Sequence, residues 1–91
     1  MKRVFHPRAF LTRKRNVKRG LSARTHILQV LEKQRSDIKN IVGLSGLHYN
    51  VVIHHLRLLE AERVVARKGE RRHFVWQLTG VGQQSLDDSQ K

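Results

Sequence analysis

The chain has 91 residues, 38% of them hydrophobic, which suits one small domain that buries only about 60% of the surface its unfolded chain exposes. Nineteen Lys and Arg against seven Asp and Glu give a net charge of +12, which indicates a polyanionic partner, most simply a nucleic acid. Cysteine is absent, which excludes disulfides and thiolate sites, and the apolar runs are too short to cross a membrane, so we expect a cytoplasmic, nucleoid-associated protein.

Residues 1–20 are strongly basic and hold no acid. A like-charged block without an apolar period repels itself, so we expect a flexible N-terminal arm. The arm residues predicted to contact DNA are Arg13, Lys14, Arg15, Lys18 and Arg19. Two alternatives stay open. The arm is either a solvated tail without a contact role, or it docks in part through Val4, Phe5, Phe10 and Leu11 onto the domain or onto a second copy.

Residues 21–88 are predicted to form the folded domain, beginning with three helices. Ser22 is the expected N-cap of the first helix, whose apolar stripe continues to about residue 34. Ser36 and Asp37 are expected to start a second, shorter helix, and Gly46 suits the left-handed conformation that ends it. The third helix is expected at about residues 48–62, with its apolar side chains inward at helical spacing.

A β-hairpin and a last helix are predicted to follow. Residues 63–68 and 73–78 have the β-branched and alternating apolar pattern of strands, and Gly69 with Glu70 supplies the turn. Thr79 is the expected cap of a weak final helix through Leu86, and residues 89–91 should fray. The predicted fold is mainly α with a small β-hairpin (α+β), with three helices, two strands and a fourth helix in that order.

A segment from Ile41 to Thr79 carries a family resemblance. Its parts are Ile41-Val42, Gly46-Leu47, the run from His48 to Leu59, Val64-Val65, and the stretch from Phe74 to Thr79. In these features the chain resembles the winged helix-turn-helix repressors of the arsenic-repressor type and their short archaeal relatives, over roughly residues 22 to 86. The resemblance implies a winged helix-turn-helix fold, with residues 48–62 as the recognition helix and residues 63–78 as the wing.

Two positions depart from the family pattern. His48 stands where the family has a Ser or Thr cap, and Glu62-Arg63 replace the Gly often found before the first wing strand. The family's metal sensors bind through cysteines or paired histidine and carboxylate sites, and no such pattern carries over to this chain. The resemblance therefore does not imply arsenic or zinc sensing.

Helix geometry selects the side chains that would read DNA. At about 100° per residue, the face of residues 48–62 opposite the apolar stripe centres on Asn50, His54 and Arg57. The N-terminal half of a recognition helix meets the bases in the major groove. The residues predicted to do so are Tyr49, Asn50, Ile53, His54 and Arg57.

The wing is expected to add affinity by contacting the backbone or the minor groove. Its predicted contact residues are Arg67, Lys68, Arg71 and Arg72. If roughly six to ten phosphates are neutralised, affinity should fall by roughly 10³ to 10⁵ between about 50 and 200 mM salt. The alternative for the helix face is an ordinary solvated surface.

Six histidines invite a metal hypothesis, which the spacing disfavours. His54 and His55 are adjacent and point about 100° apart on a helix, so they cannot share one ion. We expect His55 to be a partly buried core residue that donates to a backbone carbonyl, and His54 to face the ligand. The acids are scattered, and no nucleophile and base share an obvious site. We therefore expect no enzyme activity, no cofactor, no metal site and no small-molecule ligand.

The leading functional hypothesis is a sequence-specific transcriptional regulator that binds double-stranded DNA. We expect a homodimer, since one such module reads too few base pairs to be selective. The first alternative is a nucleoid or architectural protein that coats duplex with little sequence preference, which the basic arm favours. The second is a winged-helix adaptor in a transcription or replication assembly, whose third helix binds protein.

Overall fold

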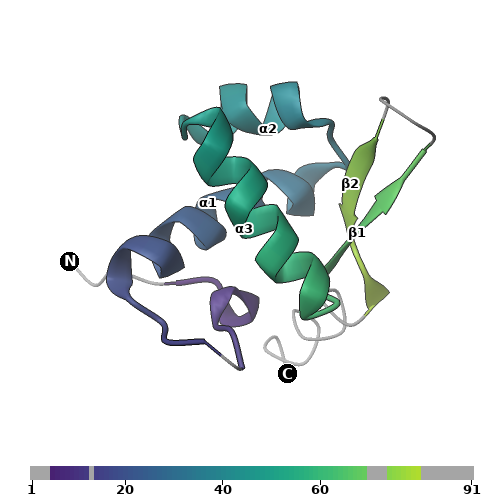
Figure 1. Cartoon of the computed structure of the whole chain (residues 1–91). Coiled ribbons are helices and arrows are strands. Elements are labelled where there is room, and N and C mark those ends of the chain that lie inside the picture. Colours follow the sequence, from purple (N-terminus) through teal and green to yellow (C-terminus); the bar gives the residue numbers. More distant parts are fainter. Residues whose placement is uncertain (1–4, 13, 70–73, 81–91) are drawn as a thin grey trace.

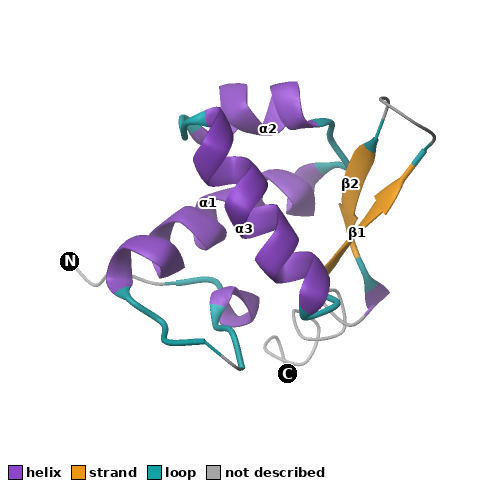
Figure 2. Cartoon of the chain, viewed as in Figure 1, coloured by secondary structure: helices purple, strands orange, loops and turns teal. Residues whose placement is uncertain are grey.

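A computed structural model of the chain describes residues 5–12, 14–69 and 74–80 (Figure 1). Its elements are a 3-10 turn η1 (Pro7–Ala9), helices α1 (Lys18–Lys33), α2 (Ile38–Ser45) and α3 (Tyr49–Ala61), and strands β1 (Val65–Lys68) and β2 (Val75–Leu78). Figure 2 shows the hairpin beside the group of helices. The fold is small, mostly helical and α+β, as predicted. The predicted last helix, from residue 81 on, lies outside the described residues.

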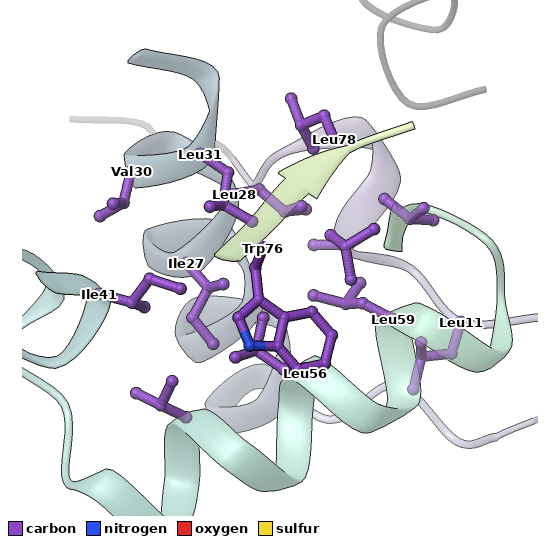
Figure 3. Packing of buried hydrophobic residues seen from close by; sticks show 14 of the residues in the cluster. Leu11, Ile27, Leu28, Val30, Leu31, Ile41, Leu56, Leu59, Trp76 and Leu78 are labelled. Carbon is purple, nitrogen blue, oxygen red and sulfur yellow. The ribbon is translucent and has the colours of Figure 1, made fainter. Parts of the chain in front are cut away.

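The core lies where the helices and the hairpin meet. Ile27 and Leu28 of α1 and Leu56 of α3 are fully buried, and Trp76 of β2 lies among them with 3% of its surface exposed (Figure 3). Burying one such aliphatic side chain contributes about 1.5 to 3 kcal/mol. The inward stripe predicted for the third helix is therefore the face that holds α3 in place, which leaves its opposite face to solvent.

Local signals set the bounds of α2 and of the turn to α3. The Asp37 side chain accepts a hydrogen bond from the Asn40 N–H at 2.8 Å, which caps the start of α2. Gly46 has φ 74°, the left-handed conformation predicted for it, and its N–H donates to the Val42 carbonyl. His48 takes the N-cap position of α3, where its Nδ1 accepts from the Asn50 N–H. The imidazole thus caps α3 in place of the Ser or Thr that the family has at this position.

Helix α1 begins earlier than the sequence predicts. The expected N-cap was Ser22, but the helix starts at Lys18, after Val17, without a side-chain cap. Tertiary packing explains the extension, because Gly20 is buried in the first turn. A Cβ at Gly20 would come within 2.9 Å of a guanidinium nitrogen of Arg24, so the glycine makes room for this buried side chain.

The strands are shorter than predicted, and one residue outside the hairpin, Ser36, pairs with β2. Arg63 has φ 64° and ends α3, so β1 begins at Val65 and not at residue 63. β2 begins at Val75, and residue 73 lies outside the described part of the chain. Ser36 forms a β-bridge with Trp76 through two main-chain hydrogen bonds of 3.0 and 2.8 Å. This bridge, which the sequence did not predict, ties the start of α2 to the hairpin.

The described residues 5–12 and 14–17, here called the N-terminal segment, pack against the helices. Ala9 is fully buried and Leu11 is 5% exposed, and both belong to the hydrophobic core. Phe5 packs against the same core. Of the four residues in the docking alternative, Phe5 and Leu11 pack as expected there, Phe10 is 49% exposed, and Val4 lies outside the described residues. The turn η1 packs against α1, and Ala9 and Leu11 join the hydrophobic core, a long-range contact that charge patterning along the chain does not reveal.

Polar contacts fasten the N-terminal segment at three places. His6 binds two residues of α1: its main-chain N–H donates to the Thr25 hydroxyl at 3.0 Å, and its ring contacts the Glu32 carboxylate. At the far end, the Thr12 N–H and hydroxyl both donate to Glu62, each at 3.0 Å. The third place is the guanidinium of Arg24. The segment therefore spans from α1 to the end of α3.

Candidate nucleic-acid interface

The outward face of α3 matches the geometry predicted from the sequence. Asn50, His54 and Arg57 are exposed, and Tyr49 is 54% exposed. Ile53 is only half-buried, because it lies at the edge of this face toward the hairpin. The face combines amide, imidazole and guanidinium groups, which are donors and acceptors that base edges can meet.

A groove of about 490 Å³ separates α3 from the hairpin. Ile53 and Arg57 line it from α3, and Arg67 lines it from β1. The Arg67 guanidinium is not free: its Nε lies 3.1 Å from a Glu60 carboxylate oxygen, and its Cζ lies 5.1 Å from the ring centroid of Phe74. Through these contacts with Glu60 and Phe74, Arg67 forms part of the wall of the groove, and its guanidinium also places a positive charge there.

Of the remaining predicted wing residues, one lies in the described part of the chain and two lie outside it. Lys68 is exposed at the end of β1. Arg71 and Arg72 lie outside the described residues. Among the described hairpin residues, Lys68 is thus a cation without an ion pair, while Arg67 pairs with Glu60.

A buried arginine supports the back of α3. Arg24 is 3% exposed; its Nε donates to the Ala9 carbonyl and its Nη2 to Asn16 Oδ1 at 3.1 Å. Its Nη1 lies 3.3 Å from Nδ1 of His55, which is also buried. Burial lowers the pKa of Arg24, and the Glu62 carboxylate opposes this shift. One guanidinium thus joins the N-terminal segment to the inner side of α3.

The contact between Arg24 and His55 defines the state of the imidazole. Burial, the charge of Arg24 and that of His54 lower the pKa of His55 to about 4. The neutral ring accepts from the guanidinium through Nδ1. This partner differs from the predicted backbone carbonyl, because the buried cation comes from a distant element. His54, by contrast, is exposed on the outward face, as predicted.

The basic residues just before and at the start of α1 do not line the groove beside the hairpin. Lys14, Arg15, Lys18 and Arg19 are all exposed, and Arg13 lies outside the described residues. Lys14 lines a cavity with the C-terminal half of α3. Lys14 and Arg15 therefore lie on the docked N-terminal segment, and Lys18 and Arg19 lie in the first turn of α1.

The chain matches no protein-family model, and no curated protein compared with it is significantly similar. Within the described residues, no helix is long and apolar enough to cross a membrane. In the same part of the chain, no three His, Asp or Glu side chains converge as potential ligands for a metal ion.

Sequence reasoning missed three participants in this region. Glu60 neutralises Arg67 across two elements, and no local pattern signals such a pair. Val51 is 37% exposed beside the outward face; its angular position, 100° from Asn50, could have placed it there. Arg63 lines cavities on two sides of the end of α3. Its left-handed backbone could have been expected from the missing glycine before the first strand.

Proposed function

We propose that the protein is a double-stranded DNA-binding transcriptional regulator of the winged helix-turn-helix type, with α3 as its recognition helix and the hairpin as its wing. The observation that carries the proposal is the outward face of α3. Its side chains Asn50, His54 and Arg57 are exposed, while the opposite face is buried in the core. This face, next to a basic hairpin, is what a helix needs to enter a major groove.

The individual contacts follow from side-chain chemistry. Asn50 suits a bidentate contact with adenine, and Arg57 suits guanine or a phosphate; each good base contact contributes about 1 to 3 kcal/mol of discrimination. Lys68, exposed on β1, would contact the backbone, where it adds affinity without sequence information. A fourth helix after Thr79 and nucleoid localisation belong to the same proposal.

Selection of bound sites from a random duplex pool tests the regulator most directly. We expect one enriched sequence, and an enriched palindrome would report binding as a two-fold pair. The Asn50→Ala variant should relax preference at one position, because the amide would no longer select adenine. A pool that remains random after selection, while the protein binds it tightly, would contradict sequence-specific regulation.

The second candidate, an architectural DNA-coating protein, is favoured by the exposed cluster at the start of α1. Deleting residues 1–19 would remove core side chains such as Leu11 along with the charge, so a charge-only variant is the better test. This variant carries Lys14→Gln, Arg15→Gln, Lys18→Gln and Arg19→Gln. Loss of nearly all binding would favour the coat protein, and retained site preference with weaker affinity would favour the regulator. Failure to bind any duplex at low salt would favour a protein-binding adaptor.

A further inference from the structure

A second cavity, of about 560 Å³, lies between the N-terminal segment and the C-terminal half of α3. Its apolar wall includes Leu11 of the segment, and Leu58 and Ala61 of α3. At 100° per residue, Leu58 lies about 140° around α3 from Ile53, which lines the groove beside the hairpin. The two hollows therefore flank α3 on different sides, with the outward face between them.

Basic side chains surround this second cavity. Arg8 and Lys14 line it from the N-terminal segment, and Arg63 lines it from the end of α3. The acid in its lining is Glu62, and both carboxylate oxygens of Glu62 already accept hydrogen bonds from Thr12. The cavity therefore has an excess of positive charge, and its carboxylate is held by donors from within the protein.

Arg8 contributes an unsatisfied donor to this cavity. Its Nε is buried and has no hydrogen-bond partner among the described residues. A buried N–H on a cation is costly when it lacks an acceptor. An anion bound in the cavity would supply acceptor oxygens close to this guanidinium.

Arg63 adds an independent observation, because its backbone is strained. It has φ 64°, a left-handed conformation that a side chain makes unfavourable and that glycine adopts freely. The conformation is held by hydrogen bonds from the Arg63 N–H to the Glu60 carbonyl and from the Thr79 hydroxyl to the Arg63 carbonyl. Strain of this kind concentrates at functional positions, which fits a role for the Arg63 side chain.

We propose that the cavity lined by Arg8, Lys14 and Arg63 seats a phosphate of the duplex backbone, on the strand opposite the one that the hairpin meets. The inference rests on the proposed function. A helix in a major groove about 12 Å wide has a phosphate backbone along each side. The hairpin serves one side, and the docked N-terminal segment serves the other. The segment thus acts as a preformed clamp whose position is set before DNA arrives.

The sharpest test uses Arg63→Gly, because this substitution should stabilise the fold and weaken DNA binding. Removing the side chain relieves the strain, so the melting temperature should rise by about 2 to 5 °C. Removing one phosphate contact should lower the salt slope of binding by about 1 and weaken binding about fivefold to tenfold at 0.1 M salt. Arg8→Gln should weaken binding by a similar factor. Both effects are measured with the full chain, by thermal denaturation and by fluorescence anisotropy with a labelled duplex.

Two further variants keep the cavity separate from the proposed function. Lys33→Gln removes one charge from an exposed position of α1 and should change binding less than twofold. Arg57→Gln tests the outward face of α3. If Arg57→Gln weakens binding while Arg63→Gly and Arg8→Gln bind like the unmodified protein or like Lys33→Gln, the phosphate seat is wrong and the proposed function stands. If the unmodified protein binds no duplex, both fail. A melting temperature that falls in Arg63→Gly would overturn the strain argument that supports the seat.

Discussion

The guanidinium of Arg24 holds together the N-terminal segment, α1 and α3, so its removal should have a large effect on stability. Arg24→Met keeps most of the apolar stem but deletes every donor. The Ala9 carbonyl and His55 Nδ1 then lose their donor, and each buried acceptor left unsatisfied costs about 1 to 3 kcal/mol. Because the methionine recovers some apolar packing, we expect the free energy of unfolding to fall by about 3 kcal/mol.

Urea denaturation followed by circular dichroism measures this change. With an m-value of about 1 kcal/mol/M for a domain of this size, the midpoint should fall by about 3 M. Arg35→Met is the matched control, because Arg35 is exposed and makes no hydrogen bond or ion pair with the described residues; its effect should stay within about 0.5 kcal/mol. Equal midpoints for the two variants would refute the role assigned to Arg24.

A milder variant covers the case in which Arg24→Met does not fold. Asn16 accepts from Arg24 and also exchanges hydrogen bonds with both main-chain groups of Leu11. Asn16→Ala should therefore cost about 1 to 2 kcal/mol and speed trypsin cleavage within the N-terminal segment. Unchanged cleavage would contradict the account of the segment as docked.

Three further predictions concern single positions. The pKa of His55 is lowered to about 4 in the fold and is about 6.5 in the unfolded chain, so unfolding takes up a proton between these values. Stability should fall by about 2 kcal/mol as the pH falls from about 6.5 to 4, and His55→Asn, which keeps an acceptor for Arg24, should flatten this fall in acid titrations of unfolding. Gly46→Ala should lower the free energy of unfolding by about 1 kcal/mol, because Gly46 has φ 74°. Gly43→Ala should raise it by up to about 1 kcal/mol, because Gly43 lies in the interior of α2 with open space around it. Urea midpoints of the two variants that shift in the same direction would contradict this reasoning. His48→Ala should cost about 1 kcal/mol through loss of the cap of α3, and His48→Ser should restore it; equal midpoints for the two would show that the cap contributes little.

The parts of the fold that the sequence predicted well depend on short-range signals. Asp37 and Gly46 act on main-chain groups within four residues, so the bounds of α2 are visible without tertiary information. The apolar period of α3 likewise fixed its inward face, and with it the exposure of Asn50 and His54. Such signals operate along one element, and the sequence contains them in full.

The parts that the sequence did not predict depend on contacts between distant segments. Arg24 reads as one more surface cation, and its burial requires acceptors from Ala9, Asn16 and His55 at once. The bridge of Ser36 to β2 is equally nonlocal. Docking of the N-terminal segment was one of the alternatives that the sequence left open, because charge patterning does not report that Ala9 and Leu11 join the core.

The central claim is that α3 and the surfaces flanking it bind duplex DNA, and equilibrium binding measured across salt concentrations tests it most directly. With a labelled 20-base-pair duplex, neutralisation of roughly six phosphates predicts an affinity that falls by about 10³ between 50 and 200 mM salt. Arg57→Gln should weaken binding at every salt concentration. Affinity that is nearly independent of salt, or no binding at 50 mM salt, would contradict the claim.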